Sequence, residues 1–183
     1  IMKLLASKKV PTHFVKRLDD RQQLIKKCEI IPIEFVVRNV ASGSICNRLG
    51  IKDGLKLKKP LLEYYLKEDS LDDPIVSRDH LELFGWATKK EIEKIDKMSL
   101  KINQYLTSHF KKKGIILVDF KIEFGRLSSD KRKIILADEI SPDSCRLWDS
   151  KSKTKLDKDV FRKGIGNLID AYEEVASRLG IVH

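Results

Sequence analysis

Charged and apolar residues alternate in the segment GIILVDFKIEFG, residues 114–125. The charged positions are Asp119, Lys121 and Glu123. Because successive side chains of a strand point to opposite faces, this alternation predicts a strand that carries all three charges on one face, about 6.6 Å apart. Two carboxylates on such a face suit Mg²⁺, which prefers hard oxygen ligands. A solvated strand face with salt-bridged neighbours is the alternative interpretation.

A second strand is expected over residues 133–137. The polar segment GRLSSDKR joins it to the first strand, and its composition is typical of a hairpin loop. Antiparallel pairing would return Asp138 toward the carboxylates of the first strand. The sequence therefore predicts a compact acidic patch of Asp119, Glu123 and Asp138, with Lys121 as the one cation inside it. Such a patch is a candidate site for a metal ion and a phosphate group.

Arg146 follows in the segment LADEISPDSCRLWD, which has a turn at Pro142. A guanidinium group can bind a phosphate or a carboxylate through two parallel hydrogen bonds. We therefore expect Arg146 to hold an anionic group of a ligand. Pairing of Arg146 with Asp149 is the structural alternative.

The segment VVRNVASGS, residues 36–44, leads from a strand into a turn of small residues. It brings Arg38 to this turn, and a short helix is expected to begin at Ser44 and to end before Gly50. Backbone N–H groups at the start of a helix attract anions. Taken alone, this turn is a weak indication of phosphate binding.

Three further segments are expected to form strands or loops before the long helices. Strands are predicted at THFVKRL (residues 12–18), at CEIIPIEFVVRNV (28–40) and at PLLEYYL (60–66). Pro32 lies inside the second of these and predicts an edge position or a bulge, because proline has no N–H to donate. The segment DDRQQLIKK, residues 19–27, is expected to form a short helix opened by Asp19.

Two long helices are expected. The first covers residues 89–112, where Thr88 and Glu91 form a capping box and apolar residues recur at helical spacing. The second covers residues 158–179, with Asp157 as its cap, Gly180 at its end and Phe161 at the start of its apolar stripe. Helices and strands that occupy separate stretches of the chain indicate the α+β class.

The composition favours anionic partners. The chain has 183 residues, of which 37 are Lys or Arg and 27 are Asp or Glu, so its formal net charge is +10. Such a surplus attracts nucleic acid or phosphorylated small molecules, although a merely solvated basic surface is the alternative. No apolar run approaches the roughly 18 residues of a membrane span, so no membrane partner is expected.

The segments VVRNVASGS, LVDFKIEFG and LADEISPDSCRLWD occur in this order, followed by KLDKDVFR. Together with YYLKEDSLDDP and GWAT, they closely resemble the SAICAR synthetase family from Val10 to the end of the chain. The resemblance implies a two-lobed fold like that of kinases and ATP-grasp enzymes. It implies a cytoplasmic, homodimeric ligase of purine biosynthesis that condenses L-aspartate with carboxyaminoimidazole ribotide through an acyl phosphate. ATP is the co-substrate and Mg²⁺ the cofactor.

The resemblance also assigns roles to residues. It implies that Glu123 and Asp138 bind Mg²⁺ beside the ATP phosphates and that Asp119 and Lys121 face the nucleotide and the substrate as catalytic residues. It further implies that Arg38, Ser44 and Arg146 contact the ribotide's phosphate and carboxylate. It places Lys67 and Asp73 on a substrate-binding loop. It also implies that the backbone at Glu29 and Ile30 contacts adenine.

One departure from the family pattern concerns the start of the chain. Family members begin with a strand-rich segment carrying a short loop with Gly and Lys that binds phosphate, and nothing here corresponds to it. Residues 1–37 are therefore expected to be a remnant of an incomplete N-terminal lobe with its linker. Residues 38–183 would be a C-terminal α+β lobe with the metal and ribotide site. The chain as given would then catalyse the reaction poorly.

Two other functions remain open at this stage. A basic nucleic-acid-binding module would follow from the net charge, but aromatic residues are not interleaved with the basic ones as a stacking platform needs. A small-molecule kinase of related fold would share the Mg²⁺ carboxylates and would not require aspartate. We expect no nucleic-acid partner.

Overall fold

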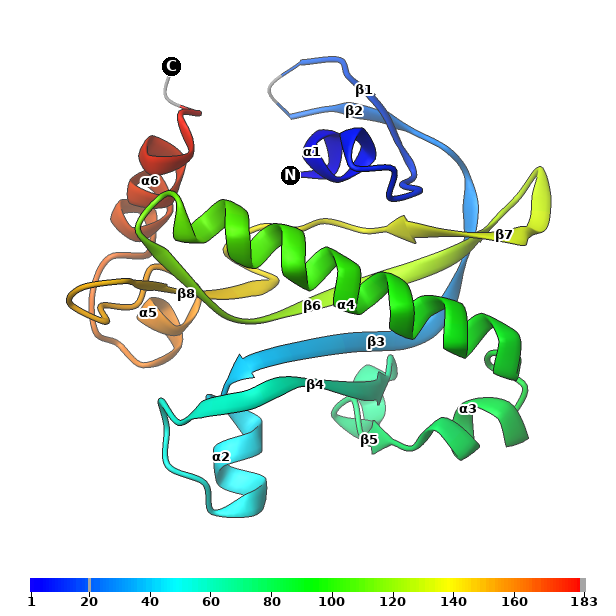
Figure 1. Cartoon of the computed structure of the whole chain (residues 1–183), viewed down its shortest axis with the longest axis horizontal. Helices are drawn as coiled ribbons and strands as arrows, with labels where there is room; N and C mark the ends of the chain where they lie inside the picture. The colour runs from blue at the N-terminus through cyan, green and yellow to red at the C-terminus, as the bar shows by residue number, and fades with distance from the viewer. Residues whose placement is uncertain (20, 182–183) are drawn as a thin grey trace. The chain divides into compact units, whose positions relative to one another are not determined.

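The computed structural model describes residues 1–19 and 21–181 (Figure 1). The helices are α1 (Met2–Ser7), α2 (Ser44–Leu49), a 3₁₀ turn η1 (Asp69–Leu71), α3 (Arg78–Leu83), α4 (Lys89–Lys111), α5 (Asp159–Arg162) and α6 (Leu168–Leu179). The strands are β1 (Phe14–Arg17), β2 (Gln23–Ile25), β3 (Cys28–Val40), β4 (Lys56–Leu66), β5 (Ile75–Val76), β6 (Ile115–Leu127), β7 (Asp130–Ala137) and β8 (Cys145–Asp149). The predicted α+β class is confirmed.

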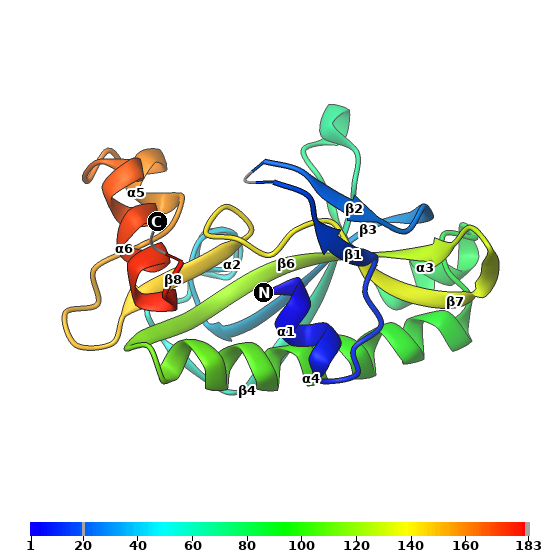
Figure 2. The same ribbon diagram turned by 90° about the horizontal axis from the view of Figure 1, so that it is seen from above.

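The strands form two sheets. The larger has six strands, of which five follow the order β5-β4-β3-β6-β7, while β8 pairs with β6. Strands β1 and β2 form a separate two-stranded hairpin, seen near α1 in Figure 2. Strands β6 and β7 pair antiparallel, with Glu123 opposite Ala137, so the predicted hairpin is confirmed.

The residues cluster into two compact units. Unit 1 comprises Ile1–Val36, Leu62–Ile102 and Ile122–Glu139, and unit 2 comprises Val37–Leu61, Asn103–Lys121 and Ile140–His183. Strands β3, β4 and β6 and helix α4 contribute residues to both. One boundary falls at Val36/Val37, but both units also include later segments, so the expected division of the chain after residue 37 stays a prediction.

Helix α4 forms where the sequence predicts it. At its start the Thr88 hydroxyl accepts from the Glu91 N–H at 3.3 Å, and the Glu91 carboxylate accepts from the Thr88 N–H at 2.8 Å. This reciprocal pair satisfies backbone donors that a helix start leaves free. The apolar stripe is buried: Ile92, Ile95, Ile102, Leu106 and Phe110. Within the described residues, no helix is long and apolar enough to cross a membrane.

Strand β6 is buried on both of its faces. Val118, Phe120, Ile122 and Phe124 are fully inaccessible, and Asp119 and Glu123 are only 3% and 2% exposed. The interpretation of a solvated, charged strand face is therefore wrong. A buried carboxylate requires a compensating partner, and both of these acids have one, as described below.

One local expectation near the start of the chain is wrong, and a second keeps only one of its two alternatives. Residues 23–25 form strand β2 instead of a helix, because the Asp19 carboxylate accepts from the N–H groups of Arg21 and Gln22 and closes a turn. Asp20 lies outside the described residues. Pro32 is in β3, an interior strand, so an edge position is excluded; its carbonyl still accepts from the Lys67 N–H at 3.0 Å. A bulge at Pro32 stays a prediction.

The second long helix is also different from the prediction. It is divided into α5 and α6, because Gly164 adopts a positive φ of 60° and Asn167 begins a new helix by accepting from the Ile169 N–H. Asp157 accepts from the Asp159 N–H but lies one residue before the cap, Lys158. Phe161 is 72% exposed, so the predicted apolar stripe is not a core face over α5.

Candidate functional site

Asp119 is the centre of a buried ionic cluster in unit 2. The Arg38 Nη1 donates to Asp119 Oδ2 at 2.7 Å, and the Arg146 Nη1 donates to both carboxylate oxygens at 3.2 and 3.0 Å. Burial raises the pKa of the Asp119 carboxyl, while the charges of Arg146 and Arg38 oppose this increase. Asp119 therefore fixes two guanidinium groups in one place.

The turn before α2 fits closely around this cluster. Arg38 donates to the Ser42 carbonyl and to the Ser44 hydroxyl, both at 3.1 Å. A side chain at Gly43 would collide with the Arg146 guanidinium, and Gly43 has a φ of 68° and a ψ of −134°. Only glycine adopts such a backbone conformation readily. The predicted group of Arg38, Ser44 and Arg146 is thus brought together.

Arg146 does not pair with Asp149, so this alternative is wrong. Its Nε donates to Asp159 at 3.1 Å, whereas Asp149 accepts from Arg178 at 2.7 Å. The Lys155 ammonium lies 3.8 Å from the same Asp159 oxygen. Asp159 thus belongs to the cluster around Arg146, which the sequence interpretation did not predict, although Asp159 stands in the KLDKDVFR segment.

Cationic groups outnumber carboxylates in this cluster. Burial lowers the pKa of the Lys158 ammonium, and the nearby positive charges of Arg162, Arg146 and Lys121 lower it further. Lys158 was also missed, although it stands in KLDKDVFR. A group of cations whose charges repel one another suits an anion with several oxygens, and two oriented guanidinium groups suit a phosphate.

Glu123 has a different environment, in unit 1. The Lys67 ammonium donates to both carboxylate oxygens, at 2.8 and 2.9 Å. The Glu123 side chain is 3% exposed, but that of Lys67 is 45% exposed. The predicted Lys67 and Glu123 are therefore brought together, with one solvent-accessible cation opposite a buried carboxylate.

Asp138 directly follows Ala137, which is opposite Glu123 in the β6–β7 pair, and it has a positive φ of 56°. His13 is close to it. Burial lowers the pKa of the His13 imidazole, and a backbone hydrogen bond at Leu136 and the charge of Asp138 oppose this. Asp138 is half-buried.

The donor set of unit 1 is compatible with Mg²⁺. Within the described ranges, no group of three or more His, Cys, Asp or Glu side chains could hold a metal ion. Mg²⁺ sites in phosphate-transferring enzymes usually need only one or two carboxylates, because phosphate oxygens and water complete the octahedron. Glu123 and Asp138 supply that number of carboxylates.

The remaining predicted residues lie in less specific surroundings. Glu29 accepts from Lys131 at 2.8 Å, and Ile30 is 38% exposed; both are in β3. Asp73 accepts from the Glu68 N–H at 2.9 Å after η1.

Because Asp119 and Lys121 belong to unit 2 and Glu123 and Asp138 to unit 1, the single acidic patch of these four residues stays a prediction.

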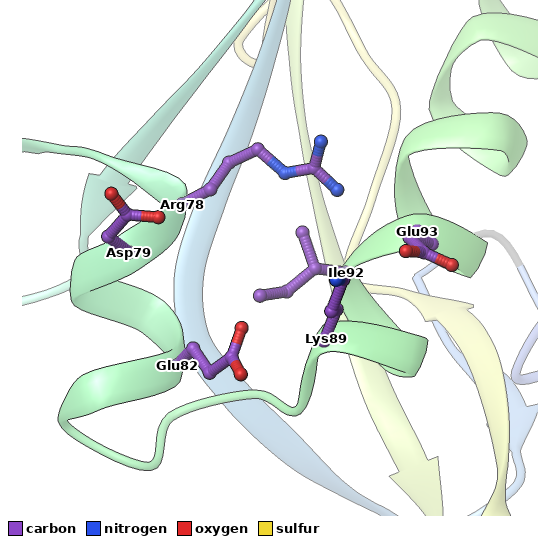
Figure 3. A pocket seen from close by; sticks show the side chains of 6 residues that line it. All are labelled: Arg78, Asp79, Glu82, Lys89, Ile92 and Glu93. Atoms are coloured by element: carbon purple, nitrogen blue, oxygen red, sulfur yellow. The ribbon is translucent and has the colours of Figure 1, made fainter.

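A pocket of about 310 Å³ lies between α3 and the start of α4 in unit 1. Figure 3 shows Arg78 and Glu82 extending from α3, and Ile92 from α4, into this space. Arg78 also lies 3.2 Å from Asp96, which accepts from the Tyr64 hydroxyl at 2.9 Å. The Arg78–Asp96 pair links α3 to α4, and none of the predicted site residues lines the pocket.

Comparisons with known proteins agree with one another. The family model described as SAICAR synthetase matches residues 1–179. The phosphoribosylaminoimidazole-succinocarboxamide synthase of Pelagibacter ubique is 61% identical over 175 residues, which are 95% of this chain and 67% of that relative.

Solved structures give the same result. The crystal structure of the synthase of the same name from Ehrlichia chaffeensis has a TM-score of 0.97 and 50% identity, and the match covers 100% of this chain and 77% of that one. A SAICAR synthetase in complex with ADP has a TM-score of 0.92 and 45% identity, with coverage of 97% and 75%. The chain thus spans about two thirds to three quarters of these relatives.

Proposed function

The chain belongs to the SAICAR synthetase family, and on that premise we propose how its residues contribute to the ATP-dependent ligation of L-aspartate to carboxyaminoimidazole ribotide. The reaction yields the succinocarboxamide, ADP and phosphate and is a step of purine biosynthesis. The observation that carries the proposal is the buried Asp119, which holds Arg38 and Arg146 side by side in a cluster with an excess of positive charge.

The cluster of unit 2 binds the ribotide. Arg38, Arg146 and Lys158 meet its phosphate and carboxylate, and the Ser44 hydroxyl, which accepts from Arg38, donates its own hydrogen to the ligand. Asp119 keeps the two guanidinium groups oriented before the substrate arrives. Such preorganisation lowers the cost of ordering side chains on binding.

The chemistry proceeds in two steps. The imidazole carboxylate attacks the γ-phosphorus of ATP, so that a new C–O–P bond forms and ADP leaves. The aspartate amine then attacks the acyl carbon, forms the amide and expels phosphate, while the amine loses its proton. Lys121 and Asp119 line the cluster that holds the reacting ribotide, and Lys121 offsets negative charge that develops on the transferred phosphoryl group.

Glu123 and Asp138 would hold Mg²⁺, and Lys67 is a movable cation beside them. When bound, Mg²⁺ neutralises the phosphate oxygens and acts as a Lewis acid. Lys67 is partly exposed and can turn from Glu123 to a phosphate or to the Asp73 loop. The backbone at Glu29 and Ile30 receives adenine.

A homodimer and a cytoplasmic location stay predictions. Light scattering tests whether the protein is a dimer.

Calorimetry of Mg²⁺-dependent ADP binding tests the metal assignment. In the full-length protein, Glu123→Gln and Asp138→Asn should each weaken Mg²⁺-dependent binding at least tenfold, because each removes a charged oxygen ligand. Glu139→Gln, next to Asp138 and exposed, serves as the control and should bind as the wild type does. Unchanged affinity in Glu123→Gln or Asp138→Asn would remove those residues from the metal site.

Omission of single substrates separates the ligase from the kinase alternative. The ligase should form no amide product without aspartate, and ADP release should depend on the ribotide. A small-molecule kinase would accumulate a stable phosphorylated product in the absence of aspartate. Stoichiometric formation of that product would overturn the ligase assignment.

A further inference from the structure

Strand β6 has an irregularity immediately before Asp119. In its antiparallel pairing with β8, Leu117 is opposite Leu147, whereas Asp119 is already opposite Arg146. Strand β6 therefore has one extra residue at this point, Val118, which forms a β-bulge. Such a bulge bends a strand and changes the direction in which its side chains point. The bulge lies where β6 enters the arginine cluster, so the groups that hold it affect the geometry of that cluster.

The bulge directs Asp119 to the face of the sheet on which it meets Arg38. Arg38 and Val40 are two residues apart in β3 and therefore share one face of that strand. Asp119 accepts from Arg38 at 2.7 Å, and Val118 belongs to one buried cluster with Val40. Val118 and Asp119 are thus on the same face although they are consecutive, whereas consecutive residues of a regular strand point to opposite faces. A regular strand would turn Asp119 away from Arg38.

The Asn39 side chain binds the backbone at the point where the bulge begins. Its Nδ2 donates to the Leu117 carbonyl at 3.2 Å. Asn39 lies between Arg38 and Val40 in β3, so its side chain is on the opposite face of the strand from theirs. A bulge disrupts the ladder of backbone hydrogen bonds, and a side-chain donor then satisfies a carbonyl. The Asn39 amide thus connects the strand that carries Arg38 to the bulge that presents Asp119.

Asn103 of helix α4 fixes the orientation of the Asn39 amide. The Asn39 Nδ2 donates to Asn103 Oδ1 at 2.8 Å, and the Asn103 Nδ2 donates to Asn39 Oδ1 at 2.9 Å. The Thr107 hydroxyl donates to the same Asn103 oxygen at 3.3 Å, and Asn103 is 4% exposed. Because a carbonyl can only accept, Leu117 requires the NH₂ end of the Asn39 amide. The reciprocal pair keeps that end turned toward the Leu117 carbonyl.

We propose that Asn39, held by Asn103, is a positioning residue of the ribotide site. Its amide maintains the bulge at Val118, and the bulge presents Asp119 to the two arginines of the cluster. Because the Asn39 side chain is on the other face of β3, it acts on the ligand only through Asp119. This inference rests on the proposed function of the arginine cluster.

A purely structural role is the alternative, in which the amide pair only secures α4 against the sheet. That role predicts a lower free energy of unfolding with unchanged ribotide affinity of the folded protein. The positioning role predicts a higher KM for the ribotide with kcat unchanged, because a misdirected Asp119 no longer orients the guanidinium groups that bind it. Measurement of KM and kcat therefore separates the two roles.

Steady-state kinetics and calorimetry of Asn39→Leu in the full-length protein test the proposal. Leucine has the branching of asparagine but neither its donor nor a charge. We expect the KM and the Kd for the ribotide to increase at least about tenfold, with kcat and Mg²⁺-dependent ADP binding within about twofold of the wild type. Leu106→Ala is the matched control. Leu106 is fully buried in α4, so this variant should destabilise the fold but leave ribotide affinity within about twofold.

Asn39→Asp tests the donor itself. At about pH 8 its carboxylate cannot donate to the Leu117 carbonyl, so ribotide affinity should decrease at least as far as in Asn39→Leu. A protonated carboxyl group can donate, and burial raises the pKa of a carboxyl group. Affinity relative to the wild type at the same pH should therefore recover as the pH falls toward about 5. Should Asn39→Leu not fold, Asn103→Ala, which leaves the Asn39 amide unheld, takes its place, with an expected weakening of about threefold.

Three results would overturn this inference and leave the proposed function intact, provided that the wild type binds the ribotide. They are unchanged ribotide affinity in Asn39→Leu, weakening in Asn39→Asp without weakening in Asn39→Leu, and equal weakening in Leu106→Ala. The second would show an effect of charge alone, and the third an effect of packing. A wild type that binds no ribotide would refute the proposed function itself, and this inference with it.

Discussion

Asp119 and Glu123 are both buried carboxylates of strand β6, four residues apart in the chain, yet their partners differ. Asp119 accepts from two guanidinium groups whose own side chains are 3% and 14% exposed. Glu123 accepts from one ammonium group that is 45% exposed. Arginine binds through a planar fork, whereas lysine is a compact charge on a flexible stem.

This difference indicates two kinds of site. The Asp119 cluster is fixed before any ligand binds, because each guanidinium has several partners and Gly43 leaves it no free space. The pair of Lys67 and Glu123 is easily rearranged, because water can replace Glu123 as the partner of the half-exposed Lys67. A fixed cluster suits recognition of one substrate, and an exchangeable cation suits a carboxylate that binds a metal only with the nucleotide.

Asp119→Asn should have the largest effect. It leaves two buried guanidinium groups without their counter-charge, which typically costs about 3–5 kcal/mol of the free energy of unfolding. Urea denaturation measures this loss, and ribotide binding should disappear. A loss below about 1 kcal/mol would mean that the cluster is not held by Asp119.

Gly43→Ala should be next, at about 2–4 kcal/mol, because strain at its φ and ψ adds to displacement of Arg146. Gly50→Ala is the matched control. Gly50 also has a positive φ of 64°, but no atom lies within 4 Å of an added Cβ, so about 1 kcal/mol is expected. Equal losses of stability and of ribotide affinity in both variants would contradict the close fit of Arg146.

A pH effect of about 2–3 kcal/mol is expected from Asp157, whose pKa burial raises to about 6. Between about pH 4 and pH 6 the folded state retains a proton that the unfolded state has lost, so stability falls as pH rises through this range. Asp157 accepts from the N–H groups of Leu147 and Asp159 and so supports the Arg146 partner. The unfolding free energy of the wild type relative to that of Asp157→Asn should decrease as the pH rises through this range. A difference between the two proteins that does not change with pH would contradict the prediction.

Lys67→Met should have the smallest effect on folding, about 1–2 kcal/mol, because water can take the place of the half-exposed ammonium beside the buried Glu123 carboxylate. Differential scanning calorimetry measures the shift, and Lys67→Arg is the charge-conserving control. A loss comparable to that of Asp119→Asn would show that the two carboxylates are held alike.

Local patterns were sufficient to predict much of the fold. The alternation in residues 118–124 gave β6, and Thr88 with Glu91 gave the start of α4. The short range of these signals also explains the errors. Asp19 closes a turn through its side chain, and the glycines between α5 and α6 interrupt a stripe that looked continuous.

The partners of the site residues were harder to predict. Arg38 pairs with Asp119 across 81 positions of the chain, and no local pattern reports such a contact. The family resemblance grouped Arg38, Ser44 and Arg146, which lie together in the structure, but it did not include Lys158 and Asp159. They stand next to the buried Asp157 in the segment KLDKDVFR. This segment supported the family resemblance and the prediction of a helix start, but neither residue was given a role.

The most direct test measures two ligands against two variants by calorimetry. Arg146→Lys should weaken ribotide binding at least tenfold, because the fork between Asp119 and Asp159 is lost, and should leave Mg²⁺-dependent ADP binding within about twofold. Glu123→Gln should do the reverse. If either variant weakens both ligands equally, the fixed cluster and the exchangeable pair are not separate binding sites, and the account is contradicted.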